Sequence, residues 1–286
     1  MTDINFQKVA VLGAGTMGAG IAQICAQAGS EVVLCDLSTE LVGKGVERVA
    51  AFLQKGVDKG KTTQEQRDQA LSQISTSTDR AGACVDVDLV VEAVPEKLEL
   101  KNGIFQELGE VTPSHCVLAS NTSSLSLAKV FEGVKGPARC IGWHFFNPVP
   151  IMKLLELVAT DATSDDTIAA SQAYGRLLNK EPILVKDSPG FASSRLGVCL
   201  GLEAIRMVES GVASAEDIDK AMVLGYGHPM GPLKLTDLVG LDVRLAIADY
   251  LREELGLEGF AAPQLMREMV AEGKLGKKSG QGFYTW

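Results

Sequence analysis

Short apolar runs alternate with amphipathic stretches up to about residue 187. Apolar runs bounded by turn residues predict buried strands, and longer stretches with apolar positions three or four apart predict helices. The predicted strands are 7–12, 31–36, 87–92, 115–119, 139–144, 154–159 and 182–186. The predicted helices between them are 16–28, 39–59, 64–73, 97–109, 125–131 and 165–178. This alternation predicts an α/β fold with a doubly wound, mostly parallel sheet.

The interval between the second and third predicted strands is too long for a simple crossover. About 50 residues separate Asp36 from the strand at 87–92, whereas crossovers in α/β units are usually much shorter. Two helix patterns fill this interval, so we predict a helical hairpin at about 39–75 that stands out from the sheet. Its inner turn carries Lys55 and Lys59 and is locally basic.

The character of the sequence changes after a turn-forming segment at 186–190. The segments beyond it have helical patterns and no convincing strand pattern. The predicted helices are 191–210, 214–224, 231–254 and 262–272. We therefore predict two domains, an α/β domain at 1–187 and an all-helical domain at 188–286.

A glycine-rich turn follows the first predicted strand and opens the first predicted helix. The spacing Gly13-x-Gly15-x-x-Gly18, with Asp36 after the next strand, is typical of a Rossmann-type fold that binds a dinucleotide. Gly13 makes the tight turn, Gly15 admits the pyrophosphate, and Gly18 lets the helix pack against the strand. The helix N-terminus then holds the negative charge. The predicted cofactor-binding residues of this segment are Gly13, Gly15, Thr16, Met17, Gly18 and Asp36.

The composition narrows the class of protein further. A formal net charge of −9 argues against a nucleic-acid partner and an anionic membrane surface, and no apolar run could span a bilayer. Because the first strand starts near Lys8, we expect no signal peptide. The six cysteines are scattered without a C-x-x-C pair, which favours reduced thiols and a cytoplasmic location. With three histidines and no ligand spacing, we expect no metal site.

His144 and Glu156 are the strongest candidates for proton-transfer chemistry. His144 lies at the end of a predicted strand, where sheets of this kind bind ligands. Glu156 lies inside the apolar strand at 154–159, where an unpaired carboxylate would be costly. A histidine partner would make the pair a base that works near neutral pH. The residues alone leave open a structural core histidine beside an unrelated glutamate.

A polar turn that contains Ser123 follows the strand predicted at 115–119. Its hydroxyls could face substrate or cofactor at the same edge of the sheet, or could simply cap the next helix. Glu96 and Lys101 follow the strand at 87–92. These two side chains could contact the cofactor at the edge of the sheet, or they could be ordinary solvated residues in the first turn of a helix.

Taken together, these segments resemble the L-3-hydroxyacyl-CoA dehydrogenase family, and within it the short bacterial 3-hydroxybutyryl-CoA dehydrogenases. The resemblance covers nearly the whole chain, in the family's order, and HFFNP and NTSS are its most distinctive pieces. The matching segments are VLGAGTMGAGIAQ, VVEAVPEKLELK, ASNTSSLS, GWHFFNPVPIMKLLELV, DSPGF, PMGPLKLTDLVGLD and KLGKKSGQGFY. The resemblance implies an NAD-binding domain with an inserted helical hairpin, followed by a helical domain through which two copies form a homodimer.

The resemblance implies catalytic roles for three of these positions and a binding role for a further one, Asn147. His144 is similar to the family's general base and Glu156 to the carboxylate that orients it. Ser123 resembles the serine that hydrogen-bonds the 3-oxygen of the substrate. Asn147 resembles a residue that helps to bind both cofactor and substrate near the nicotinamide.

The resemblance also assigns residues around the cofactor and reveals one departure. Glu96, Lys101 and Lys278 fall on positions that the family uses around NAD. Most relatives have an asparagine where this chain has Ser194, so the hydrogen bonding of this fourth polar catalytic position differs from the family pattern.

The activity that the resemblance implies is oxidation of an L-3-hydroxyacyl-CoA by NAD, and its reverse, in fatty-acid β-oxidation or butanoate metabolism. The acyl-CoA carries several negative charges, which gives Lys55 and Lys59 a use as substrate-binding residues, although each could equally be a solvated charge. Two alternatives remain at this stage. One is a related NAD-dependent dehydrogenase of a free sugar acid, of the gulonate type, and the other is a non-catalytic NAD-binding structural protein.

Overall fold

The computed structural model describes residues 6–286. The chain divides into two compact units, the first of which ends at Asp187 and the second of which runs Ser188–Trp286. Each unit has its own hydrophobic core, and each is described by itself below.

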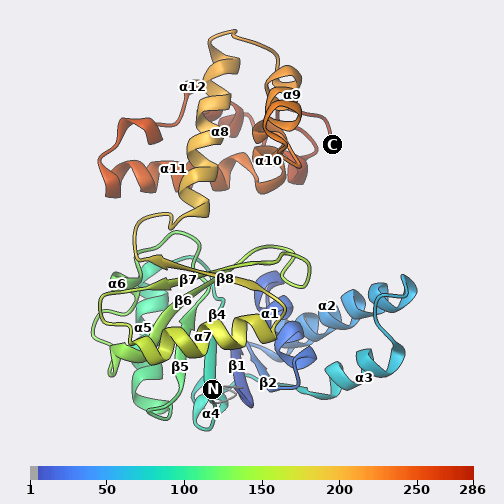
Figure 1. The fold of residues 1–286 in the computed structure, drawn as a ribbon, viewed down its shortest axis with the longest axis vertical. Helices are drawn as coiled ribbons and strands as arrows, with labels where there is room; N and C mark the ends of the chain where they lie inside the picture. The colour runs from blue at the N-terminus through green and yellow to red at the C-terminus, as the bar shows by residue number, and fades with distance from the viewer. Residues whose placement is uncertain (1–5) are drawn as a thin grey trace. The chain divides into compact units, whose positions relative to one another are not determined.

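The first unit is built on one eight-stranded sheet (Figure 1) with the order β3-β2-β1-β4-β5-β6-β7-β8. The strands are β1 (Lys8–Leu12), β2 (Glu31–Cys35), β3 (Ile74–Ser77), β4 (Leu89–Glu92), β5 (Val117–Ser120), β6 (Cys140–Phe145), β7 (Leu154–Ala159) and β8 (Glu181–Lys186). Every neighbouring pair is parallel except β6 and β7, which are antiparallel. The predicted mostly parallel α/β fold is therefore confirmed.

Helices cover both faces of this sheet, which explains why its strands are continuous apolar runs. Val9 and Val11 of β1 belong to a core cluster with residues of α1 and α7. Ala10 between them is fully buried on the opposite face, where α4 contacts β1. The helices on the sheet are α1 (Thr16–Gln27), α4 (Arg80–Cys84), α5 (Leu98–Val111), α6 (Leu127–Val130) and α7 (Asp165–Leu177).

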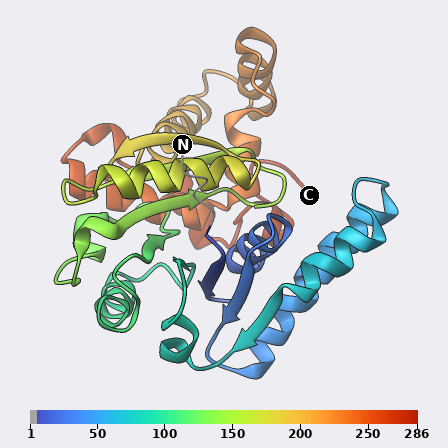
Figure 2. The same ribbon diagram turned by 60° about the horizontal axis from the view of Figure 1, so that its bottom comes forward.

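Two helices, α2 (Thr39–Asp58) and α3 (Gln64–Ser72), form the expected hairpin, which extends away from the sheet in both views (Figures 1 and 2). Local sequence sets where each helix begins. The Ser38 hydroxyl caps α2, and Thr63 exchanges reciprocal hydrogen bonds with Gln66 at the start of α3. The basic turn joins the two helices at the end of the hairpin that is far from the sheet (Figures 1 and 2).

Two elements between the hairpin and β4 are absent from the sequence prediction. The edge strand β3 has the sequence ISTS, in which only one residue is apolar, so the hydrophobic pattern does not reveal it. The short helix α4 depends on an Asp79 side chain that caps its first turn. The predicted helix at 125–131 is also shorter in the structure, because α6 covers only Leu127–Val130.

The second unit contains only helices, as predicted, but one predicted helix is wrong. The segment 231–254 forms two helices, because the chain turns at Gly240, whose φ of 108° an L side chain rarely adopts. The helices of this unit are α8 (Ser193–Glu209), α9 (Ala215–Tyr226), α10 (Pro232–Val239), α11 (Leu241–Leu255) and α12 (Gln264–Ala271). The buried carboxylate of Asp237 accepts hydrogen bonds from the backbone of Phe283 and Tyr284, which anchors the C-terminal segment.

Within residues 6–286, no helix is long and apolar enough to cross a bilayer. The same residues contain no group of three or more histidine, cysteine, aspartate or glutamate side chains that could hold a metal ion. Five of the six cysteines are buried. Burial raises the pKa of the Cys25 thiol to about 12, which makes it unreactive.

Candidate active site

In the glycine turn between β1 and α1, two of the three motif glycines lie so close to other backbone atoms that a side chain would not fit. Gly13 has a φ of +99°, and a Cβ there would lie 2.6 Å from the carbonyl oxygen of Ala93. A Cβ on Gly18 would lie 1.7 Å from the carbonyl oxygen of Gly13. Gly15 differs, because nothing lies within 4 Å of the position of its Cβ. The backbone at Gly15 is thus open to a ligand.

The N-terminus of α1 fits a pyrophosphate. Its N-cap residue, Gly15, makes no side-chain hydrogen bond to the helix, and no acidic residue occupies the first turn. The first backbone N–H groups of a helix lack partners within the helix and favour an anion. Thr16 lines the hollow next to this turn, whereas Met17 packs partly against the core.

Asp36 at the end of β2 is held against the same turn. Its carboxylate accepts hydrogen bonds from the backbone N–H groups of Ala14, at 2.6 Å, and Leu37, at 2.7 Å. Arg48 of α2 donates to the carbonyl oxygen of Ala14 at 3.0 Å. Nothing in the sequence pattern singled out Arg48, because it lies in a helix that the motif does not include.

His144 and Glu156 face each other on the two antiparallel strands. They are direct cross-strand partners in the register of β6 and β7, so their side chains leave the same face of the sheet. The His144 Nδ1 atom lies 2.6 Å from Glu156 Oε2. Both residues are buried, with exposed fractions of 5% and 0%. A carboxylate on Nδ1 fixes the imidazole so that Nε2 is the nitrogen that exchanges a proton.

The turn after β5 is tied to the strand that carries His144. The Asn121 side-chain oxygen accepts a hydrogen bond from the backbone N–H of Phe145 at 3.0 Å. Phe145 directly follows His144, so this bond fixes the end of β6. Sequence reasoning missed this role of Asn121, since no spacing rule connects a turn residue with a strand 24 residues later.

Ser123 lies in this turn, and Glu96 holds it there. Glu96 Oε1 accepts hydrogen bonds from Thr122 Oγ1 at 2.5 Å and from the backbone N–H of Ser123 at 2.9 Å. The other oxygen, Oε2, lies 3.3 Å from the ammonium of Lys101. Glu96 and Lys101 are therefore linked to the turn that contains Ser123, and their roles in cofactor binding stay predictions.

Asn147 lines a hollow between α1, α2 and the loop after β6. This hollow has a volume of about 260 Å³, and Thr16 and Arg48 are among its other lining residues. A neighbouring hollow of about 400 Å³ shares Gln23 and Phe52 with it and extends along the hairpin. Its lining lysines are Lys55, Lys59 and Lys61. The sequence prediction included the first two and missed Lys61.

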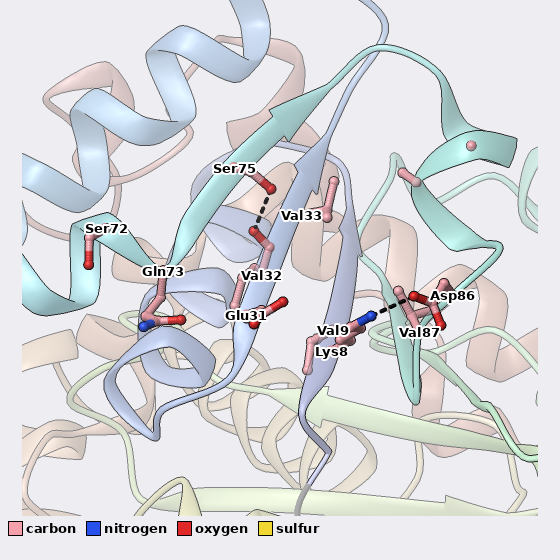
Figure 3. A pocket seen from close by; sticks show the side chains of 12 residues that line it. Lys8, Val9, Glu31, Val32, Val33, Ser72, Gln73, Ser75, Asp86 and Val87 are labelled. Atoms are coloured by element: carbon pink, nitrogen blue, oxygen red, sulfur yellow. Dashed lines mark hydrogen bonds and ion pairs between the residues drawn. The ribbon is translucent and has the colours of Figure 1, made fainter.

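Another hollow, of about 480 Å³, lies at the amino ends of the strands (Figure 3). Lys8 and Asp86 form an ion pair of 2.5 Å at its edge, and Ser75 donates to the carbonyl oxygen of Val32. Sheets of this type bind ligands at the opposite, carboxyl ends of their strands. Although this hollow is larger than the other two, we assign the chemistry to the carboxyl ends, where the glycine turn and His144 lie.

The remaining predicted residues, Ser194 and Lys278, belong to the second unit. Ser194 lies in the first turn of α8. Lys278 lies near the C-terminal segment and forms an ion pair of 2.5 Å with Asp242. The cofactor role of Lys278 and the catalytic role of Ser194 stay predictions.

Two domain families match the chain in succession. Residues 8–188 match the NAD binding domain of 3-hydroxyacyl-CoA dehydrogenase. Residues 190–286 match the C-terminal domain of the same enzyme. The chain belongs to the 3-hydroxyacyl-CoA dehydrogenase family. Its cofactor is NAD, for which the glycine turn and the uncapped N-terminus of α1 provide a fitting cradle.

Individual members of the 3-hydroxyacyl-CoA dehydrogenase family match over almost the entire chain. A 3-hydroxybutyryl-CoA dehydrogenase of Mycobacterium tuberculosis is 45% identical over 282 residues, which make up 98% of each chain. The mitochondrial hydroxyacyl-coenzyme A dehydrogenase of Homo sapiens is 43% identical over 99% of this chain and 92% of its own. The crystal structure of (S)-3-hydroxybutyryl-CoA dehydrogenase from Ralstonia eutropha has a TM-score of 0.94 at 43% identity, covering 98% of this chain and 99% of that one.

The position of Asp36 predicts a preference for NAD over NADP. A carboxylate at the end of β2 accepts hydrogen bonds from the adenosine ribose and repels a 2′-phosphate. We expect kcat/KM to be higher with NAD by at least about tenfold, which corresponds to ~1.4 kcal/mol. Initial rates with each cofactor measure this ratio. An equal or higher kcat/KM with NADP would show that Asp36 does not face the ribose.

Replacement of Ser194 by alanine is expected to have a small effect. A serine hydroxyl is shorter than the asparagine of most relatives and offers one donor instead of two. We therefore expect it to bond a ligand through water, or the substrate and Ser123 to satisfy each other. We expect Ser194→Ala to cost about 1 kcal/mol or less in kcat/KM, and Ser194→Asn to retain or raise activity. A loss beyond about a hundredfold in Ser194→Ala, with the fold intact by circular dichroism, would instead assign the hydroxyl a direct role.

Proposed function

We propose that this protein catalyses the NAD-dependent oxidation of L-3-hydroxyacyl-CoA to 3-oxoacyl-CoA and the reverse reduction, with short-chain 3-hydroxybutyryl-CoA as the preferred substrate. The observation that carries this proposal is the buried contact of 2.6 Å between His144 and Glu156 at the end of β6. The names of the relatives from Mycobacterium tuberculosis and Ralstonia eutropha support the choice of substrate.

His144 acts as the base in this proposal. Its Nε2 takes the proton of the 3-hydroxyl group while Nδ1 donates to the Glu156 carboxylate. The negative charge of Glu156 stabilises the imidazolium that forms, because the pair is buried and little screened by solvent. Bound NAD supplies the hydride acceptor. In the reverse direction, protonated His144 returns the proton to the 3-keto oxygen.

Ser123 and Asn147 orient the reactants. The hydroxyl of Ser123 hydrogen-bonds the 3-oxygen of the substrate. This bond keeps the reacting carbon in place and stabilises the charge that develops on the 3-oxygen. Asn147 lines the same hollow as Thr16 and Arg48, which supports a position for its amide near the start of α1. Both roles rest on the position of these residues around the carboxyl ends of the strands.

The CoA moiety binds along the hairpin in this proposal. Three lysines, Lys55, Lys59 and Lys61, line one hollow on a protein whose net charge is −9. Such a local positive field attracts the phosphates of CoA, while the acidic remainder of the surface disfavours other polyanions. A free sugar acid carries a single carboxylate, which could pair with only one of these three charges.

We also infer a cytoplasmic homodimer, formed through the second unit. Large apolar side chains are exposed on its helices, among them Leu196 at 70%, Leu224 at 81% and Tyr226 at 78%. Burial against a second copy would remove this apolar surface from water. Light scattering at micromolar concentration is expected to give twice the mass of 30.3 kDa. A monomeric mass would contradict the dimer.

A chain-length series tests the proposed substrate. Initial rates of NADH formation should be measured with short-, medium- and long-chain L-3-hydroxyacyl-CoA esters. We expect the highest kcat/KM with the four-carbon ester, roughly tenfold above the long-chain esters. A preference for long chains would contradict the short-chain assignment while leaving the reaction type intact.

A further inference from the structure

The loop between β6 and β7, residues 146–153, forms a wall that the two hollows beside α1 and α2 share. Pro150 lines both hollows, and Asn147 and Val149 line the smaller one. A Cβ on Gly20 of α1 would lie 2.8 Å from the Cβ of Val149, so the loop packs directly against the helix that begins at the glycine turn. The course of this loop therefore sets the shape of both hollows.

One buried side chain binds two backbone carbonyl groups of this loop. The Nζ atom of Lys180 donates to the carbonyl oxygen of Val149 at 2.5 Å and to that of Met152 at 2.9 Å. Within residues 6–286, no backbone N–H group donates to either oxygen. Carbonyl groups that are removed from water need a donor, and Lys180 supplies the donors that the backbone does not provide here.

The charge of Lys180 is buried without a carboxylate beside it. Lys180 is 5% exposed, and in the part of the chain that the structure describes no carboxylate forms an ion pair with it. Burial lowers the pKa of Lys180, and the positive charge of Lys153 lowers it further. An apolar side chain would fill the same space without the cost of a buried charge. The ammonium is therefore explained by its N–H donors rather than by its packing.

The backbone around Lys180 belongs to regular elements. Its own N–H donates to the carbonyl oxygen of Gly175 in α7 at 3.0 Å, and Asn179 before it has a φ of 59°, a left-handed conformation that commonly ends a helix. Glu181 after it begins β8 and donates to the carbonyl oxygen of Lys153 at 2.8 Å. Lys180 thus links an irregular loop to a helix and a strand that are fixed in the first unit.

We propose that Lys180 is a positioning residue, which holds the β6–β7 loop so that Asn147 meets the reactants at the nicotinamide end of the cofactor. The proposal rests on the role of Asn147 given under Proposed function. Lys180 binds the carbonyl group two residues after Asn147, so loss of this bond lets the Asn147 amide shift. The adenosine end of the cofactor is assigned to Asp36 and the glycine turn, and Lys180 donates to neither.

Two ligands separate an effect on the loop from a general loss of structure. NADH carries the nicotinamide, whereas ADP-ribose shares its adenosine and pyrophosphate and lacks the nicotinamide. We expect Lys180→Met to raise the Kd of NADH by about three- to tenfold, as for one lost hydrogen bond, and to leave the Kd of ADP-ribose within about twofold. Calorimetric titration measures both constants. Neither needs turnover, so a failure of the proposed substrate would be distinguishable from a failure of this proposal.

The same variant is expected to lower kcat with 3-hydroxybutyryl-CoA by at least about tenfold, since misplaced reacting groups are slow. Lys180→Arg keeps charged N–H donors and should bind NADH more tightly than Lys180→Met. Lys180→Gln, whose amide is too short to reach both carbonyl groups, gives the same comparison should Lys180→Met fail to fold.

Two further variants complete the test. Lys153→Met removes an exposed lysine of the same loop, whose Nζ lies 2.9 Å from the side-chain oxygen of Asn179. It serves as the matched control, with kcat and both dissociation constants expected to equal those of the wild type. In an Asn147→Ala background, Lys180→Met is expected to raise the Kd of NADH by less than about twofold more, because residues that act through one another are not additive.

Four results would overturn the proposal. Wild-type kcat and NADH affinity in Lys180→Met would show that the loop keeps its place without the lysine. An equal rise in the Kd of NADH and of ADP-ribose would limit Lys180 to the stability of the unit. A full effect of Lys180→Met in the Asn147→Ala background would place its action elsewhere. Wild-type kcat and NADH affinity in Asn147→Ala alone would reject the proposed role of Asn147, and the positioning role with it.

Discussion

Replacing His144 with glutamine is expected to lower kcat by about 10²–10⁴-fold, the usual contribution of general acid–base catalysis. Glutamine has a similar reach but cannot take up a proton, so the 3-hydroxyl group loses its base. The glycine turn lies between β1 and α1, and Asp36 directly follows β2, so we expect this substitution to leave both unaffected. The Kd of NADH should therefore stay within about threefold of the wild-type value.

Steady-state kinetics with 3-hydroxybutyryl-CoA and fluorescence titration with NADH measure these two quantities. His115 is an exposed histidine of the same unit, whose ring is 65% exposed and lies 3.3 Å from Asp88. His115→Gln is therefore a matched control and should retain wild-type kcat. A His144→Gln enzyme within about threefold of wild type would show that another residue is the base.

Replacing Glu156 with glutamine is expected to lower kcat by about 10²-fold or more. The amide keeps the size of the side chain but loses the charge that stabilises the imidazolium. Its NH₂ group can also donate to His144 Nδ1, which would move the imidazole proton to Nε2 and block the base. A carboxylate-to-amide change behind a catalytic histidine costs about 10⁴ in serine proteases for this reason.

Glu181 on the adjacent strand β8 provides a matched control, because it is exposed and pairs with Leu154 in the register of β7. Glu181→Gln should leave kcat unchanged. Thermal unfolding of Glu156→Gln checks that the fold is intact. Wild-type kcat in a folded Glu156→Gln protein would mean that the carboxylate only completes the core.

The strands that build the site are predictable because they are buried on both faces. Runs such as 89–92 and 154–159 consist mostly of consecutive apolar residues. This pattern is typical of a strand that is buried on both faces, so the sequence alone predicts it. The edge strand β3 is polar and exposed, and the pattern misses it. The break at Gly240 is missed for a related reason, since the helices on both sides of it have apolar faces and a single glycine interrupts neither.

The site is predictable where a residue type conflicts with its surroundings. Glu156 stands out as a carboxylate in an apolar strand, and the glycines stand out by their spacing. Arg48 does not stand out, because a charged residue in an amphipathic helix looks solvated until the fold encloses it. Lys101 is a candidate from the sequence, but the pattern does not reveal whether its side chain is solvated or buried. The burial of Lys101 depends on β4 and on the turn after β5, and contacts of this kind are set by tertiary structure alone.

The initial rate of NADH formation from (S)-3-hydroxybutyryl-CoA tests the central claim most directly. The same assay should be run with free 3-hydroxybutyrate and with L-gulonate, using the intact protein and saturating NAD. We expect kcat/KM for the CoA ester to exceed that for either free acid by at least about 10²-fold, because remote binding energy from CoA supports the chemical step. Equal or higher kcat/KM with a free acid, or no turnover of the CoA ester, would contradict the account.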